Sequence, residues 1–113
     1  MTDNLALKVK ELKQMILDSE EYRNFDLYRR LLKEVPELFE QVNQFRHDNF
    51  MLQISGEIQN KEKAEEIVEK NKDLFNNSLV TPFLNAELVL CKMLQDINEM
   101  LVDEIDMDVD FLK

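Results

Sequence analysis

The stretch VTPFLNAELVLCKMLQDINEMLVDEI, residues 80–105, decides the fold. Thr81 can cap a helix and Pro82 suits a first helical turn, although a start at Ser78 also fits the sequence. The apolar residues that follow cover more than one narrow stripe of a helix. Such a helix should contact two or more neighbours, or a second subunit. The stretch therefore predicts a long C-terminal helix at the centre of the molecule.

Two helices are predicted at the N-terminal end. Thr2 or Asp3 can cap the first, whose apolar residues recur at steps of three and four. Ser19 can cap the second, which should extend to about Lys33. Pro36 disfavours helix in the residue before it and is tolerated in a first turn, so it marks the start of a third helix.

The third helix should run from Pro36 to Ile54, where Ser55-Gly56 offers a C-terminal cap. Asn60 can cap a fourth helix, which should run to about Phe75. The short connection between these two helices predicts a long antiparallel helical hairpin. The predicted fold class is thus all-α, a helical bundle of about five helices.

Composition supports a single helical domain over residues 1–113. The mass of 13.5 kDa is that of one domain. The chain has one glycine and two prolines, too few for the turns of a sheet protein or the glycine-rich loops of an α/β enzyme. Residues 106–113 have neither a cap nor a helical period, so we expect them to form a frayed acidic tail.

The charge of the chain favours proteins as partners. A formal net charge of −10 repels phosphate backbones and anionic membranes, so direct binding of nucleic acid is not expected. No apolar run approaches the length of a membrane-spanning helix. A single cysteine and an N-terminus without a signal-peptide pattern predict a cytoplasmic protein.

Residues with catalytic or metal-binding chemistry are scarce. His47 is the only histidine, and its neighbours supply neither a nucleophile nor a second metal ligand. Cys91 lies among Leu90 and Met93, which predicts a buried and inert thiol. The sequence therefore predicts no catalytic, metal or cofactor site, and a protein that is not an enzyme.

One basic cluster supports an alternative function. It lies on the second predicted helix beside aromatic residues, and it could face RNA or an acidic partner. Aromatic side chains pointing inward and cations pointing outward would explain the same pattern without a function. The alternative to a protein-binding module is therefore an RNA-binding adaptor that uses Arg23, Arg29, Arg30 and Lys33.

Three strings resemble the YlbF/YmcA family of small helical regulators. They are ILDSEEY at residues 16–22, the spacing Leu38-Phe39-x-x-Val42-x-x-Phe45, and Val80-x-x-Phe83-Leu84-x-Ala86-Glu87-x-x-Leu90. The resemblance extends from about Leu5 to Ile105. It implies an all-α fold with a long hairpin and self-association, commonly as dimers.

The same resemblance implies a regulatory function. Members of the family are implicated in competence, biofilm formation and sporulation, and the better-described ones work in a complex that affects RNA processing through an endoribonuclease. None is known as an enzyme. Some members hold iron–sulfur clusters with C-terminal cysteines, but this chain ends at residues 110–113 without one. A cluster shared through Cys91 would need thiolates from a partner.

We therefore predict a non-enzymatic regulatory module. It should be a homo-oligomer, with a dimer favoured, that also binds other regulatory proteins through apolar helix faces. The predicted interaction surface comprises Phe39, Val42, Phe45, Leu52, Phe83, Leu84, Leu88, Leu94 and Leu101.

Overall fold

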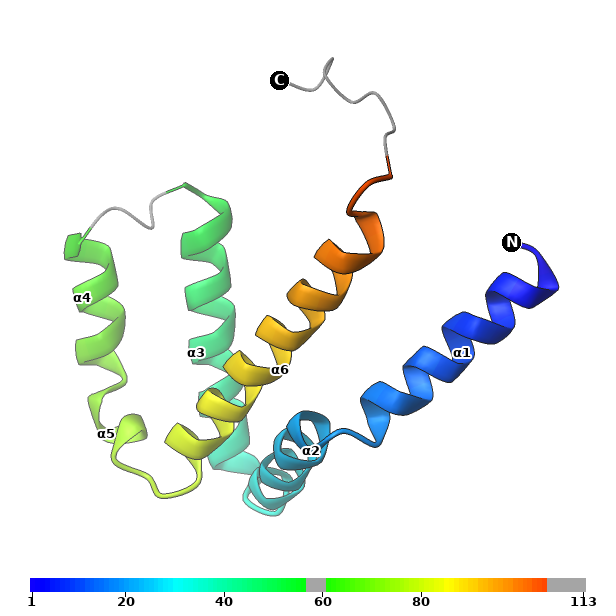
Figure 1. Ribbon diagram of the computed structural model, residues 1–113. Coiled ribbons are helices and arrows are strands. Elements are labelled where there is room, and N and C mark those ends of the chain that lie inside the picture. The colour runs from blue at the N-terminus through cyan, green and yellow to red at the C-terminus, as the bar shows by residue number, and fades with distance from the viewer. Residues whose placement is uncertain (57–60, 106–113) are drawn as a thin grey trace.

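The computed structural model describes residues 1–56 and 61–105, and within these ranges the chain forms six α-helices and no strand (Figure 1). The helices are α1 (Asp3–Leu17), α2 (Glu20–Lys33), α3 (Pro36–Ile54), α4 (Lys61–Lys70), α5 (Lys72–Phe75) and α6 (Val80–Val102). The predicted all-α helical bundle is confirmed. The predicted acidic tail, residues 106–113, lies outside the described residues.

Most predicted helix boundaries have the expected local chemistry. The Thr2 hydroxyl caps α1 by accepting a hydrogen bond from the Leu5 amide at 3.3 Å. Ser19 caps α2 in the same way, accepting from the Tyr22 amide at 3.2 Å. Pro36 is the first residue of α3. Gly56 follows this helix with a φ of +76°, a backbone conformation that residues other than glycine rarely adopt.

Two predicted boundaries are wrong. The fourth predicted helix is divided at Asn71 into α4 and α5. The Asn71 side-chain amide donates to the Ile67 carbonyl at 2.7 Å and shares this acceptor with the Asn71 backbone N–H, at 3.2 Å. The last helix begins at Val80, one residue before Thr81. The Thr81 hydroxyl does not cap it and donates instead to the Phe75 carbonyl at 3.1 Å.

The core lies where α6 crosses α2 and meets α3 and α5. The packing of α6 on α2 is the most extensive between any two helices described. Phe83 of α6 is fully buried and stacks on Phe25 of α2, with ring centroids 5.4 Å apart. Phe45 of α3 meets Phe75 of α5 edge to face at 5.0 Å. The buried cluster consists of Leu32, Val42, Leu74, Val80 and Phe83.

Helix α4 lies beside α3, away from α1 and α2 (Figure 1). Lys70 Nζ of α4 lies 3.6 Å from a carboxylate oxygen of Asp48 on α3. The Gln44 side-chain amide also donates to Asp48, at 2.9 Å, and these two contacts lower the pKa of that carboxyl. Residues 57–60, which join the two helices, lie outside the described residues, so the hairpin stays a prediction.

The molecule is open at its N-terminal end. No residue of α1 is buried, although the helix has apolar side chains. The radius of gyration is 18.0 Å, against about 13 Å for a compact domain of this length. Figure 1 shows α1 and the C-terminal half of α6 extending away from the core on the same side.

Replacing Phe83 with Ala should lower the free energy of unfolding by about 3–5 kcal/mol, because a fully buried ring leaves a cavity shared by three helices. Urea denaturation at a fixed protein concentration measures the change. The matched control is Phe50→Ala, whose ring is exposed on α3 and whose removal should cost less than about 1 kcal/mol. Equal losses in the two variants would place the core elsewhere.

Candidate interaction surfaces

The nine residues predicted to form an interaction surface fall into three groups. Val42, Leu52 and Phe83 are buried in the chain's own core, so they cannot contact a partner in this conformation. Their apolar spacing predicts burial, but it does not indicate whether the same chain or a partner buries them. Phe39, Phe45 and Leu84 are partly buried against the same core. The remaining three, Leu88, Leu94 and Leu101, are exposed along α6.

A groove of about 590 Å³ lies between α3 and α6. We call it the α3–α6 groove. The exposed side chains of Phe50 and Leu88 and the partly buried Phe45 and Leu84 form its apolar lining. Four amide side chains also line it, namely Asn49, Gln53, Asn85 and Gln95. An apolar floor with neutral hydrogen-bonding groups suits a peptide or helix better than an ion.

Sequence reasoning missed Phe50 as a surface residue. The sequence pattern predicts one apolar stripe on the third helix, and this stripe does not include Phe50. In the structure Phe50 is exposed on α3, whereas Val42 and Leu52 on the stripe are buried. The only sequence signal for Phe50 is an apolar residue outside the main stripe. That signal does not indicate which neighbouring helix lies beside the residue.

An ion pair joins the two walls of the α3–α6 groove. Arg46 of α3 lies 2.6 Å from a carboxylate oxygen of Glu87 on α6. The same guanidinium stands over the ring of Phe83, 5.3 Å from its centroid. Both partners are partly buried. The pair therefore fixes α3 relative to α6 and neutralises the only charges lining the groove.

The prediction that Cys91 is buried is wrong. The thiol is exposed and lines the α3–α6 groove. Leu90 is buried and Met93 is partly buried, whereas Cys91 is exposed on the same helix. Neighbours in sequence therefore do not share its environment.

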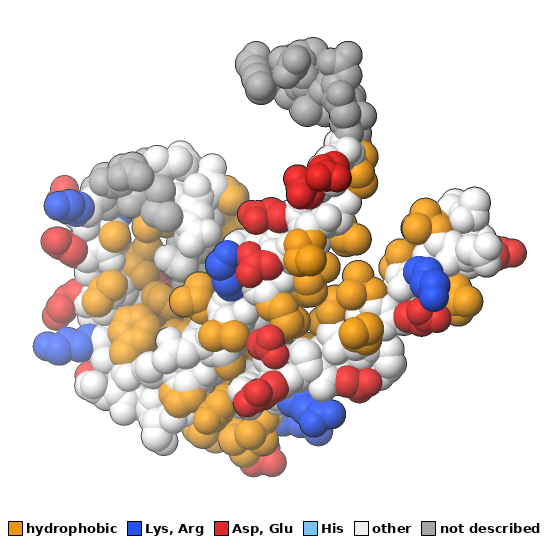
Figure 2. Space-filling view, in the orientation of Figure 1, with side chains coloured by type: hydrophobic (Ala, Val, Ile, Leu, Met, Phe, Trp, Pro, Cys, Tyr) orange, Lys and Arg blue, Asp and Glu red, His pale blue; other side chains and the backbone are white. Residues whose placement is uncertain are grey.

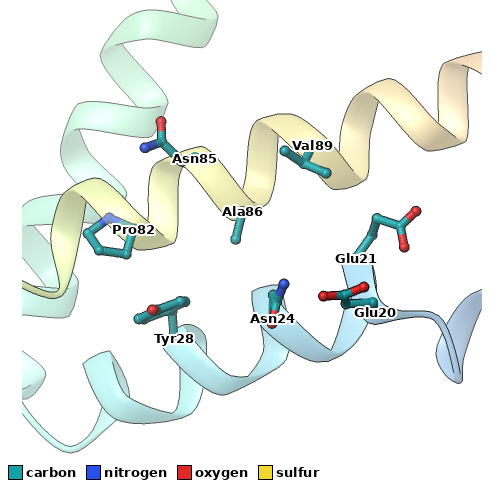
Figure 3. Close-up of a pocket in the computed structure, with 8 residues that line it drawn as sticks. All are labelled: Glu20, Glu21, Asn24, Tyr28, Pro82, Asn85, Ala86 and Val89. Carbon is teal, nitrogen blue, oxygen red and sulfur yellow. The ribbon is translucent and has the colours of Figure 1, made fainter.

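A second hollow, of about 600 Å³, lies between α2 and α6 (Figure 3). From α2 it is lined by Glu20, Glu21, Asn24 and Tyr28, and from α6 by Pro82, Asn85, Ala86 and Val89. Both glutamates lie in the first turn of α2, where the helix dipole stabilises negative charge. The ionisable groups in this lining are the two carboxylates and the Tyr28 phenol.

The basic cluster on α2 is partly occupied by internal contacts. Asp26 forms ion pairs with both Arg29 and Arg30. The hydrogen bond to Asp26 raises the pKa of the Arg29 guanidinium, which also lies 5.4 Å from the centre of the Phe25 ring. Arg23 and Lys33 are exposed. Arg29 therefore has a structural role, and the cluster offers less free positive charge than its sequence indicates.

The other residues with possible chemistry are dispersed. His47 is exposed, and its Nδ1 lies 3.7 Å from Asp48. Over residues 1–56 and 61–105, no three His, Cys, Asp or Glu side chains come together as a metal site would need. In the same ranges, no helix has the length and apolar content needed to cross a membrane.

Replacing Glu87 with Gln should lower the free energy of unfolding by about 1–2 kcal/mol, because it leaves the partly buried Arg46 guanidinium without its counter-charge. Thermal or urea denaturation measures the loss. Asp96→Asn is the matched control, since Asp96 pairs with Lys92 on the exposed side of α6. A loss no larger than that of the control would mean that the Arg46–Glu87 pair does not hold the two helices.

Comparison with known proteins identifies the family. No curated protein and no solved structure gives a significant match. A family model described as "Control of competence regulator ComK, YlbF/YmcA" matches residues 6–106, which is most of the chain. The matched range includes all six helices except the first turn of α1. The chain therefore belongs to the YlbF/YmcA family, a family of regulators described by its control of the competence regulator ComK.

Proposed function

We propose that this chain is a non-enzymatic regulatory protein of the cytoplasm that acts by binding proteins. Its partners are a second copy of itself, in a dimer, and other regulatory proteins, within a complex that affects RNA processing. The observation that carries the proposal is the apolar surface of α6. Leu88 is exposed in the α3–α6 groove, and Leu94 and Leu101 are exposed further along the same helix. Leu88 lies about 120–140° around the helix from Leu94 and Leu101, so α6 exposes apolar side chains on two faces. Exposed apolar surface beyond scattered single residues is a feature of protein interfaces.

The two hollows favour binding over catalysis. The α2–α6 hollow holds carboxylates, amides and a phenol, and the α3–α6 groove holds Cys91 without a histidine beside it. Nucleophilic catalysis needs a nucleophile within hydrogen-bond reach of a base. In the α2–α6 hollow, Glu20 and Glu21 lie at one end and the Tyr28 phenol lies at the other (Figure 3). In the α3–α6 groove, the Glu87 carboxylate is paired with Arg46. Both hollows supply surface that a helix of a partner could cover.

The contacts of the basic cluster favour protein partners over RNA. Phosphate binding depends on lysine and arginine side chains that are free to neutralise the backbone. Arg29 and Arg30 already share Asp26. The net charge of −10 adds a long-range repulsion of nucleic acid.

Self-association through α6 can be tested with Leu94→Asp. The variant should be a monomer, because a charge on an apolar contact would be desolvated in both copies. Light scattering coupled to size exclusion gives the mass, and circular dichroism shows whether the chain stays helical. A helical oligomer of unchanged mass would contradict self-association through this face.

Binding of other proteins through the α3–α6 groove can be tested by capture from the native lysate. Tagged wild type is compared with Leu88→Asp, and Val68→Asp serves as control because it places the same charge at an exposed apolar site on α4. We expect partners that survive nuclease treatment, that are lost with Leu88→Asp and that are retained with Val68→Asp. Mass spectrometry identifies them.

Two outcomes of that experiment would contradict the proposal. Partners that disappear on nuclease treatment would favour the RNA-binding adaptor. Partners retained equally by both variants would mean that the groove is not the binding surface.

A further inference from the structure

Helix α6 carries one apolar line that its own chain covers only in part. The line has six positions, separated alternately by four and three residues. Five are apolar, namely Phe83, Leu90, Leu94, Ile97 and Leu101, and Glu87 occupies the position between Phe83 and Leu90. This is the spacing of a helix that packs lengthwise against other helices. Phe83 and Leu90 are buried, whereas Leu94 and Leu101 are exposed. We call the three residues of this line beyond Leu90, namely Leu94, Ile97 and Leu101, the α6 seam.

Helix α1 carries a line of the same spacing. Leu5, Val9, Leu12 and Ile16 are separated by four, three and four residues. We call these four residues the α1 seam. None of them is buried, and Leu5 and Val9 are exposed. A helix of 15 residues has little stability by itself in water, so its apolar line needs a cover.

The two seams lie on one side of the molecule. Figure 1 shows that the N-terminal end of α1 and the C-terminal end of α6 extend from the core in the same direction. Figure 2 shows apolar side chains along both segments on the visible face. The chain supplies no further described helix beside them, because α3, α4 and α5 lie on the other side of α6.

The excess of exposed area is larger than the area that each partner buries in a stable dimer. The accessible surface is 9286 Å², against about 6,500 Å² for a compact monomer of this mass. Residues 57–60 and 106–113 would contribute at most roughly 2,100 Å² to this surface, the value for a fully extended chain. Without them about 7,200 Å² remains, against about 6,000 Å² for a compact chain of the other 101 residues, an excess of about 1,200 Å². A stable interface buries about 800 Å² on each partner.

We propose that the α1 seam and the α6 seam of one chain pack against the same two seams of a second copy, so that four helices share one core. The proposal rests on the self-association proposed above and names the elements that make it. A symmetric dimer needs a surface that is complementary to itself, and two apolar lines of equal spacing form one.

The charge distribution determines how a contact between two copies should respond to salt. Each chain has a net charge of −10, so two copies repel one another except where they meet without charges. Neither seam contains a charged residue. Apolar contact then drives the association and long-range repulsion opposes it. The dimer should therefore become tighter as salt is raised, the opposite of a contact made by ion pairs.

The chain offers closely matched controls for a test. Leu5 and Leu7 are exposed by 55% and 54%, but Leu7 is turned about 200° around α1 from the seam. Leu101 and Val102 are exposed by 56% and 54%, and Val102 lies outside the α6 seam. Each of the four is replaced by Asp, and sedimentation equilibrium gives the dimer dissociation constant. All four variants carry the same added charge.

We expect Leu5→Asp and Leu101→Asp to raise the dissociation constant by roughly 100-fold or more, and the two controls to change it by less than about threefold. Hydrogen exchange gives a second measurement that does not depend on the folding of a variant. In the wild type, the amides of α1 should exchange more slowly as protein concentration rises, while those of α2 stay unchanged. In Leu101→Asp the amides of α1 should lose this dependence.

The outcomes separate this inference from the proposed self-association. Equal effects of Leu5→Asp and Leu7→Asp, or exchange in α1 that does not depend on concentration, would overturn the role of α1. If the chain still dimerised in those cases and Leu94→Asp abolished the dimer, self-association through α6 would stand without α1. A wild-type chain that stays monomeric at every concentration would refute both.

Discussion

The packing of Phe83 joins three helices at one point. Its ring stacks on Phe25 of α2 and lies under the guanidinium of Arg46, which α3 carries and Glu87 of α6 holds in place. The direction of α6 relative to α2 and α3 depends on these contacts. From this crossing α6 continues beyond the core. The packing of Phe83 therefore fixes the crossing and, with it, the part of α6 that is left exposed.

Local chemistry made the helices predictable and tertiary contacts made their surroundings unpredictable. Ser19, Pro36 and Gly56 act on their own backbone, so their effect can be deduced from the sequence. The break at Asn71 was missed because asparagine occurs both inside and outside helices, and its competing bond to Ile67 is visible only in the structure.

The interaction surface was predictable only in part, for a related reason. An apolar line on a helix predicts burial but does not say whether the same chain or another covers it. Leu52 and Leu101 have the same side chain on long helices, yet one is covered by its own chain and the other is exposed. Cys91 was misplaced because its environment was inferred from sequence neighbours, although adjacent residues on a helix point about 100° apart.

The small core has a consequence for how a single copy tolerates substitution. Only eight residues of the described chain are buried apolar residues. Few positions are therefore constrained by packing within one copy. Most substitutions at the exposed positions should leave the stability of a single copy nearly unchanged, so their effects should appear in what the chain binds.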